Sequence, residues 1–509
     1  MKNISLSKTK YCQAVQCKKM LWLNEYKPEC AAAKDETVFK NGIKVGELAK
    51  GLLGDYEDVP YDKKSVMIEK TRKLMLDEPN IITEASFRFD DNFCRVDILK
   101  NDLDGVEIYE VKSSSSCYEK NSTRLKEVFL DDAAYQYFVL SSLDLNVKKV
   151  CLVYINNKYK LDKKLDIKKF FKIKDITEEV KQKQDEIRYN IDMIKKYMAE
   201  HDSETEPIKK IGMCCFKPYE CGYWNYCTRN LPKPNVFDIS GMWDSTKLKK
   251  YYGGKISFED LENDRTIKSE KYKQQINFEL HEQEAKIEKD AIKEFLDNLE
   301  YPLSFLDYET IWPPIPILKG TRPYQQIPFQ YSLHILEKDE EGDRLVHKQF
   351  LADVNDEDMI RTFANQLDED LPKKGSIIVF NEDFESRINR GIGKMYNDLK
   401  DKMDKINDRM VDIMKPFEDR VYYSKGMQGS YSLKYVLPAL YPDDPELDYS
   451  NLSLIHHGGE ASGAFENLKD KTPEEQKAIK DALYKYCGLD TYALVKILEK
   501  FKEVTKDNF

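Results

Sequence analysis

The sequence predicts an α/β protein in which two sheet-containing domains are joined by a helical connector. The chain has 509 residues, a length typical of about three domains, and its 41% hydrophobic and 12% aromatic content can fill real cores. Short apolar runs typical of buried strands alternate with helical stretches in residues 1–230 and again in residues 301–509. Residues 231–300 are charged and mostly helical in pattern. We therefore expect domains at 1–230 and 301–509 and a connector at 231–300.

Charge and hydropathy limit the classes of function. The net charge of −10 argues against indiscriminate coating of DNA, so local basic patches would have to contact phosphates. The longest apolar runs fall far short of the ~20 residues that a membrane span requires. The first residues lack the apolar core of a signal peptide, so we expect a cytoplasmic protein with no membrane contact. Nothing in the sequence indicates which proteins would be its partners.

The run 303–310 is the central feature of the predicted C-terminal domain. It is apolar and aromatic, and prolines bound it on both sides, as expected of a buried strand. Asp307 and Glu309 lie two residues apart, so both carboxylates share one face of that strand. Two like charges there are costly unless a cation holds them, although an Asp and a Glu on a solvated edge strand would show the same pattern.

Two more acidic positions follow in usable places. The predicted strand 376–380 leads into a helix start that carries Glu385, and a helical segment near the end of the chain carries Tyr486 and Asp490. With Asp307 and Glu309, these carboxylates could hold two Mg²⁺ or Mn²⁺ ions roughly 3.5–4 Å apart, a pair that clamps the attacking and leaving oxygens of a phosphodiester. Tyr486 would then orient or deprotonate the attacking water.

Taken together, these motifs resemble a DEDD-type 3′→5′ exonuclease of the RNase H-like fold, in its tyrosine variant. The resemblance covers residues 301–509, and its motifs follow the order of that family. The matching positions are Asp307-x-Glu309, Asn381-x-x-Phe384-Glu385, Arg409-Met-Val-Asp412, Ser432-Leu-Lys-Tyr-Val-Leu437 and Tyr486-x-x-x-Asp490. The chain departs from the family at Glu385, where the family usually has Asp.

A second acidic motif lies in the N-terminal half. Residues 93–99 and 106–112 predict two strands joined by a turn at 101–105, which brings Asp97 near Glu110 and puts Glu110 and Lys112 on one face. Two carboxylates and a lysine are a minimal site for metal-assisted phosphodiester hydrolysis. Asp97 and Glu110 would hold Mg²⁺ or Mn²⁺, and Lys112 would position the water and offset developing charge. The alternative is an ordinary Glu/Lys pair on a surface hairpin.

Eleven cysteines in a chain of cytosolic character indicate metal binding or buried thiols more than disulfides. Four of them fall in one short window, at positions 214, 215, 221 and 227. Thiols so closely spaced favour a metal or iron–sulfur site, and a structural zinc would also be satisfied by four thiolates.

The order of these features is similar to that of RecB-family PD-(D/E)XK nucleases, specifically the CRISPR-associated and AddB-type exonucleases with an iron–sulfur cluster. The resemblance covers residues 1–230. It implies a 4Fe-4S cluster on Cys17, Cys215, Cys221 and Cys227, with Cys12 and Cys214 as rival ligands and Zn²⁺ as the alternative metal. It also implies a catalytic motif, which consists of Glu47, Asp97, Glu110 and Lys112, and a downstream glutamine at Gln136.

The whole arrangement resembles a bacterial family of uncharacterised two-nuclease proteins. We expect a metal-dependent nuclease that hydrolyses DNA in repair, recombination or defence. The loop residues Arg322 and Tyr324 should lie just beyond the Asp307 site, where they could contact a phosphate or a stacked base. His456 and His457 are expected to be non-catalytic. An RNA-processing exonuclease, or a nucleic-acid-binding scaffold with a degenerate site, remains an alternative.

Overall fold

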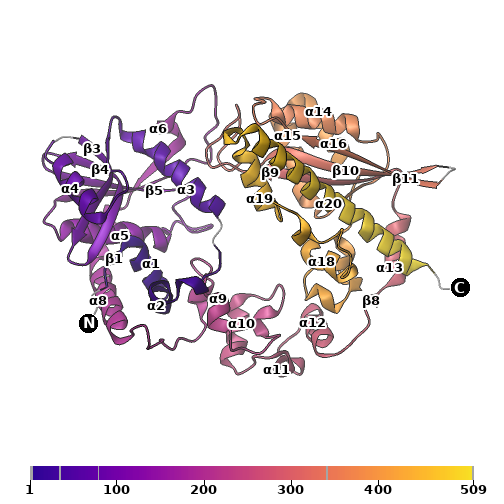
Figure 1. Ribbon diagram of the computed structural model, residues 1–509, viewed down its shortest axis with the longest axis horizontal. Coiled ribbons are helices and arrows are strands. Elements are labelled where there is room, and N and C mark those ends of the chain that lie inside the picture. The colour runs from indigo at the N-terminus through magenta and orange to yellow at the C-terminus, as the bar shows by residue number, and fades with distance from the viewer. Residues whose placement is uncertain (1–3, 34–35, 78–79, 340–341, 507–509) are drawn as a thin grey trace. The chain divides into compact units, whose positions relative to one another are not determined.

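The computed structural model describes residues 4–33, 36–77, 80–339 and 342–506. The fold is mixed α/β. The chain forms two compact units, of which the first comprises Met1–Asn230 with Pro313–Tyr324, and the second Leu231–Trp312 with Gln325–Phe509 (Figure 1). Among the described residues, no helix combines the length and the apolar character that crossing a membrane requires.

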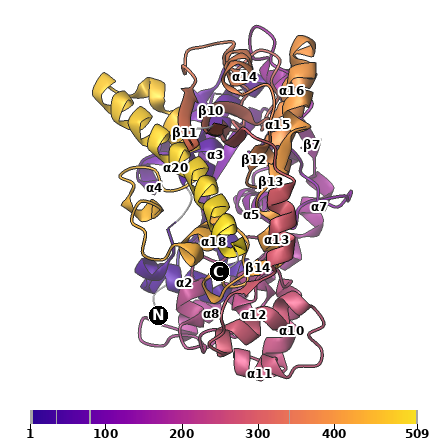
Figure 2. The same cartoon turned by 90° about the vertical axis from the view of Figure 1, so that its right-hand side faces the viewer.

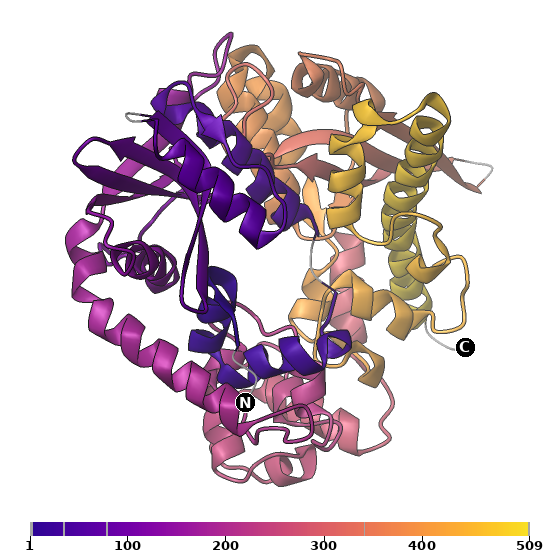
Figure 3. The same ribbon diagram turned by 60° about the vertical axis from the view of Figure 1, so that its left-hand side comes forward.

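The first unit is built on one sheet, drawn in indigo to magenta and turned toward the viewer in Figure 3. Its strands follow the order β2-β3-β4-β5-β6-β7, and β1 pairs with β4 in parallel. Neighbouring pairs β3–β4, β4–β5 and β6–β7 are antiparallel, whereas β5–β6 is parallel. The strands are β1 (Leu6–Ser7), β2 (Glu57–Asp58), β3 (Asn80–Phe89), β4 (Asn92–Asp102), β5 (Gly105–Lys112), β6 (Val147–Ile155) and β7 (Phe171–Asp175). The predicted hairpin of residues 93–112 is therefore β4–β5.

Helices that pack on this sheet complete the first unit. Near the N-terminus, the backbone of Cys17 is extended (φ −159°, ψ 113°) and separates two helices. The buried face of α5 carries Tyr135 and Leu140 into the main hydrophobic core. The helices are α1 (Lys8–Gln16), α2 (Lys18–Tyr26), α3 (Glu36–Ala49), α4 (Lys64–Leu74), α5 (Glu127–Ser141), α6 (Ile167–Phe170), α7 (Thr177–Gln182), α8 (Gln184–Glu200) and α9 (Trp224–Thr228).

Residues 231–300 are mostly helical, and they belong to the second unit. Gln275 donates hydrogen bonds to the carbonyls of Asp238 and Gln428, both at 3.0 Å, and Phe278 and Ile292 lie in the hydrophobic core of that unit. This segment, predicted as a separate connector, thus packs as part of the C-terminal unit. Its elements are α10 (Asp244–Tyr252), α11 (Phe258–Glu262), α12 (Glu270–Leu280), β8 (Lys286–Ile287), which pairs with β14 (Tyr422–Tyr423), and α13 (Lys289–Asp297).

The second unit has a sheet in the order β11-β10-β9-β12-β13. The strands β9, β10 and β11 form an antiparallel meander, and β12 and β13 run parallel to β9. The strand β9 is buried at every position except Asp307, which explains its continuous apolar sequence. The bounds are β9 (Leu303–Ile311), β10 (Ile327–Asp339), β11 (Gly342–Leu351), β12 (Ile377–Val379) and β13 (Met410–Asp412).

Alternate residues of β10 contact helices on opposite faces of this sheet. The ring of Tyr331 packs against Phe363 of α14 (Met359–Asp370), whereas His334 and Ser332 hydrogen-bond to Thr491 of α20 (Pro473–Thr505). Figure 2 shows α20 crossing the strands β10 and β11. Other helices of the unit are α15 (Glu382–Met395), α16 (Lys400–Asn407), α17 (Lys415–Glu418), α18 (Leu433–Leu440) and α19 (Gly458–Glu466).

Candidate metal centres

Three carboxylates of the second unit converge where α20 packs on β9. Ligand oxygens of Asp307, Glu309 and Asp490 all lie within 4.8 Å of one another. The two-residue spacing on β9 puts the first two on one face, as predicted, and α20 contributes the third from the neighbouring layer. In the described part of the chain, no Lys or Arg forms an ion pair with any of the three.

Burial and mutual repulsion make this group unusually hard to ionise. Burial, and then the nearby charge of Asp490, raises the pKa of Asp307 well above its usual range. Burial and the charge of Asp307 do the same to the pKa of Glu309. Burial raises the pKa of Asp490 to about 7, even though hydrogen bonds from two tyrosines oppose the shift. A bound cation would remove both penalties, because it replaces protons on the same oxygens.

Glu385 supplies the fourth carboxylate that the sequence predicts. It lies in the first turn of α15 and is only 1% exposed, and its Oε2 has no hydrogen-bond partner. Burial, followed by the charges of Asp307, Asp412 and Glu309, raises its pKa well above the usual range. A buried carboxylate oxygen without a partner is costly, and a cation is the natural group to satisfy it.

The turn that presents Glu385 is fixed by Asp412. Its carboxylate accepts hydrogen bonds from the backbone N–H groups of Asn381 (3.0 Å), Glu382 (3.2 Å) and Met414 (2.9 Å). Asn381 adopts a left-handed conformation (φ 76°) that turns the chain sharply from β12 into α15. The predicted strand-to-helix junction at 381–385 is thus stabilised by hydrogen bonds to Asp412 of the neighbouring strand β13.

Two tyrosines adjoin Asp490. Tyr486 lies one helical turn before it and is 7% exposed, as its spacing predicts. Tyr449 was missed by the sequence analysis, because its loop carries no periodic or motif signal. Its hydroxyl donates a 2.5 Å hydrogen bond to Asp490 Oδ1, and it lines a cavity of about 580 Å³ together with Lys434 and His456.

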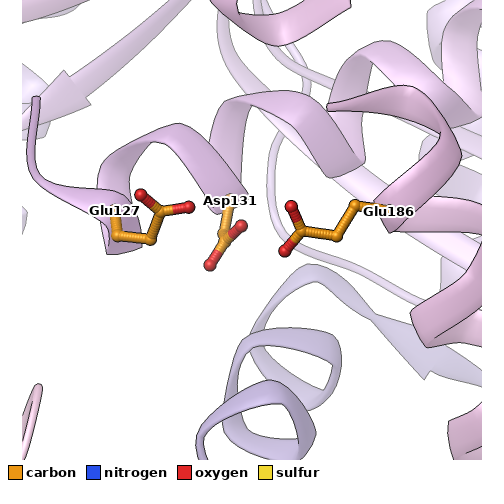
Figure 4. Close-up of side chains that lie close together, drawn as sticks. All are labelled: Glu127, Asp131 and Glu186. Carbon is orange, nitrogen blue, oxygen red and sulfur yellow. The ribbon is translucent and has the colours of Figure 1, made fainter. Parts of the chain in front are cut away.

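The donor set of this centre fits Mg²⁺ or Mn²⁺. All four side chains offer carboxylate oxygen, which is the ligand type that hard divalent cations prefer. An acidic cluster in the first unit has a different character (Figure 4). Its members Glu127, Asp131 and Glu186 also lie within 4.8 Å of one another, but Lys183 forms an ion pair with each of them. Each of its carboxylates thus already has a cationic partner, and Glu127 has a second one in Arg124.

The predicted Asp97–Glu110–Lys112 group does come together at the β4–β5 pair. Lys112 Nζ lies 2.8 Å from Glu110 Oε1, and Gln136 Nε2 of α5 donates to Glu110 Oε2 at 2.5 Å. Asp97 accepts the backbone N–H of Val111 at 2.7 Å. Burial and the charge of Glu110 raise the pKa of Asp97 to about 7.

Two further residues of this group lack any sequence motif. Lys8 Nζ contacts Glu110 Oε1 at 2.7 Å, and Asp132 forms an ion pair with Lys112. Burial alone would raise the pKa of Glu110, but Lys112 and Lys8 hold it well below its usual range. Three carboxylates and two ammonium groups thus share this buried site.

Glu47 is not part of this contact network. It lies on the exposed side of α3 and pairs with Lys50 at 2.8 Å, and Lys50 also pairs with Asp58 at 2.9 Å. The acidic residue of β3 that affects the pKa of Asp97 is Glu84 instead. Its backbone has a positive φ of 59°, and its side chain pairs with Arg95 at 2.9 Å. The helical register of α3 turns Glu47 toward solvent, which a motif match alone does not reveal.

The loop expected beside Asp307 packs in the first unit. The hydroxyl of Tyr324 donates to the carbonyl of Ser113 at 2.9 Å, directly after Lys112, and also contacts the Ser113 hydroxyl at 2.9 Å. The neighbouring residue Thr321 accepts a backbone hydrogen bond from Leu161 at 3.0 Å. Arg322 is exposed in the same loop. Tyr324 therefore belongs to the surroundings of Lys112, contrary to the sequence-based expectation.

The segments that carry the predicted cluster cysteines lie side by side. Gln16 donates to the carbonyls of Cys214 (2.9 Å) and Tyr219 (2.7 Å), and Ala32 donates to that of Gly222 (2.8 Å). Burial raises the pKa of each thiol in this region, and the neighbouring cysteines raise it further. These mutual effects link Cys17, Cys215, Cys221 and Cys227, and they include the rival ligand Cys214.

The structure does not gather the sulfurs of these cysteines into a compact group. Zn–S bonds of about 2.3 Å bring tetrahedral thiolates to roughly 3.8 Å from one another. Among the described residues, no three cysteine sulfurs approach within 4.8 Å. An iron–sulfur cluster separates its thiolates more widely, because each binds a different iron atom. Cys12 is engaged elsewhere, since its thiol donates to Asp132 at 3.0 Å.

Comparisons with known proteins find similarity to parts of the chain. A family model described as a domain of unknown function, DUF2779, matches residues 304–432, a stretch that includes Asp307, Glu309 and Glu385 but ends before Asp490. The uncharacterised protein MG366 of Mycoplasma genitalium is 27% identical over 223 residues, which cover 40% of this chain and 32% of that protein. The chain thus spans about a third of the length of this curated relative. No solved structure matches.

Proposed function

We propose that this chain is a metal-dependent nuclease that hydrolyses phosphodiester bonds of DNA at two sites, of which the second is a 3′→5′ exonuclease. One observation carries the proposal. Asp307, Glu309 and Asp490 place carboxylate oxygens within 4.8 Å of one another, and the charges of Asp307 and Glu309 also act on the buried Glu385. Among the described residues, no Lys or Arg forms an ion pair with these carboxylates. Such a group is unfavourable by itself and favourable around divalent cations.

The topology of the second unit supports an exonuclease of the DEDD type. Counted from β9, its strand order is 3-2-1-4-5, with the first three strands antiparallel and the last two parallel to the first. This is the order of an RNase H-like sheet. The carboxylates come from the first strand, from the helix start after the fourth, and from the last long helix, as in that fold.

Divalent cations held by these carboxylates would activate water and stabilise the charge that develops on the phosphate. The tyrosines have a separate role. Burial and the nearby carboxylates raise the pKa of Tyr486 well above its usual range, so its phenol keeps its proton and orients the attacking water by hydrogen bonding. Tyr449 donates a hydrogen bond to Asp490 and thereby fixes the direction of that ligand.

For the first unit, the contact of Asp97, Glu110 and Lys112 supports a PD-(D/E)XK nuclease site. The contacts between the segment of Cys17 and that of Cys215, Cys221 and Cys227 support a shared metal site, which the resemblance makes a 4Fe-4S cluster, with Zn²⁺ as the alternative. In this proposal, Glu84 takes the neighbouring acidic position that was expected for Glu47.

The test is an assay of the full chain with Mg²⁺ or Mn²⁺ on end-labelled single- and double-stranded DNA and RNA. We expect shortening from 3′ ends, and we expect Asp307→Asn to abolish it. Glu186→Gln is the matched control, because that carboxylate belongs to an acidic cluster and already pairs with Lys183. Digestion from 3′ ends that continues unchanged in Asp307→Asn would refute the second site. Faster digestion of RNA than of DNA would redirect the proposal to RNA.

A further inference from the structure

Lys8 is a half-buried cation of the first site that no motif assigns. Its Nζ lies 2.7 Å from Glu110 Oε1, the same oxygen that Lys112 contacts at 2.8 Å. Its side chain is 21% exposed, and the charges of Asp97 and Asp132 also act on it. Two ammonium groups therefore converge on one oxygen of a predicted metal ligand.

The N-terminal segment holds Lys8 rigidly in place. Leu6 and Ser7 form β1, which pairs with β4, and the buried hydroxyl of Tyr135 donates to the carbonyl of Leu6 at 2.9 Å. The Ser7 hydroxyl caps α1 by accepting the N–H of Lys10 at 3.3 Å. One turn further, the ring of Tyr11 stacks on Tyr135 at 4.8 Å. Lys8 is thus fixed at the first position of a helix that is anchored on both sides.

Neutralisation of Glu110 does not by itself require Lys8. Lys112 already contacts Oε1, and Gln136 donates to Oε2, so both oxygens have a partner without it. At Glu110 two lysines meet on one oxygen. Lys112 also pairs with Asp132, whereas Glu110 is the single carboxylate with which Lys8 forms an ion pair among the described residues. Lys8 could therefore contact another anion without leaving Glu110 unpaired.

We propose that Lys8 is a second active-site lysine of the first unit, which contacts the scissile phosphate and competes with the divalent cation for Glu110. The inference rests on the proposed nuclease function of that site. Lys8 forms no covalent bond. The water oxygen bonds to phosphorus, the ester P–O bond breaks, and the Lys8 ammonium donates a hydrogen bond to a non-bridging oxygen whose negative charge grows.

Direct binding of Mn²⁺ tests the competition, in the full chain with Asp307→Asn and Asp490→Asn to silence the second centre. Lys8→Met should lower the Mn²⁺ dissociation constant about tenfold, because a positive charge that repels the metal is removed. Turnover at saturating Mn²⁺ should fall about 10²-fold or more. Lys10→Met is the matched control, since Lys10 lies on the same helix but pairs with Glu25 at 2.5 Å. It should leave both quantities unchanged.

Lys8→Arg keeps the test decisive if Lys8→Met fails to fold, which a thermal melt reveals. Arginine preserves the charge but not its position, so Mn²⁺ affinity should stay near that of the parent while turnover falls. Parental affinity and turnover in Lys8→Met, or parental turnover in Lys8→Arg, would overturn the proposal. Asp97→Asn separates the two levels of inference. If Asp97→Asn left Mn²⁺ binding unchanged, the first unit would hold no metal there, and the proposed function of that site would fail whatever Lys8 does.

Discussion

At the scale of single residues, Glu385 shows how one carboxylate can destabilise the metal-free protein and stabilise the metal-bound protein. Its Oε2 is buried without a partner, and nearby carboxylates raise its pKa well above the usual range. With a cation bound, the same oxygen becomes a ligand. The free energy of unfolding should therefore depend on the metal. A substitution of Glu385 should raise it or leave it unchanged without metal, and should lower it with metal bound.

We predict that Glu385→Gln is at least as stable as the parent in a chelator and less stable in Mg²⁺. At a concentration about 100 times its dissociation constant, Mg²⁺ should stabilise the parent by about 2.7 kcal/mol, and the variant should lose most of this gain. Denaturant unfolding with and without Mg²⁺ measures both. A variant that gains as much from Mg²⁺ as the parent would remove Glu385 from the metal centre.

His334 is a second residue with a measurable consequence. Burial, and then the nearby His347, lowers its pKa to about 3, and its Nδ1 hydrogen-bonds to the Thr491 hydroxyl at 2.8 Å. Because the folded pKa lies below the unfolded value of about 6.5, the unfolded state binds the proton more readily between these values. The contribution of His334 is thus complete above pH 6.5 and is lost as the pH falls toward 3.

We predict that the free energy of unfolding declines below pH 6.5 with a slope of up to about 1.4 kcal/mol per pH unit from this group. His334→Asn should remove that part of the slope, whereas His201→Asn, a change at a half-buried histidine of the first unit, should not. Urea unfolding of the parent and both variants from pH 4.5 to 7.5 would measure this slope. Parallel pH profiles for His334→Asn and the parent would contradict the assignment.

At the scale of elements, the segments with strong periodic patterns could be predicted from the sequence. The run 303–310 is strand β9, the hairpin of residues 93–112 is β4–β5, and the segment that carries Tyr486 and Asp490 is α20. Features that depend on contacts between residues far apart in the chain could not be predicted from the sequence. The break at Cys17, the packing of 231–300 and the docking of 313–324 arise from tertiary partners, as do the positions of Lys8, Asp132 and Tyr449. These three residues reach their sites from segments without a motif.

Helix α1 connects the first site to the cysteines, because Lys8 lies at its start and Cys17 follows its end. Lys8 begins α1, and Cys17 follows its last residue, nine residues further on or about 13 Å along the axis.

We predict that anaerobically purified protein is brown with stoichiometric iron, and that Cys221→Ser loses colour, solubility and the activity of the first site together. Iron analysis and visible absorption measure this. Cys30→Ser, at a thiol that contacts Glu29, is the control and should keep its iron. A colourless parent with stoichiometric zinc would refute the iron–sulfur proposal.

At the scale of the whole molecule, each compact unit contains its own acidic centre, so the two activities should separate by mutation. Lys112 offsets developing charge without being a metal ligand in our proposal, so Lys112→Ala should reduce the rate at the first site by about 10²–10³-fold, with little change in metal affinity. Asp307→Asn should abolish 3′→5′ digestion and leave the first activity intact. Because the substituted residues belong to different compact units, the double mutant should show both losses without further coupling. All three variants are assayed with the parent on the same labelled substrates.

If Lys112→Ala alone removed every activity, the second unit would act only as a binding platform for the first. If it removed none, the Glu110–Lys112 ion pair would be structural and the second unit would be the nuclease.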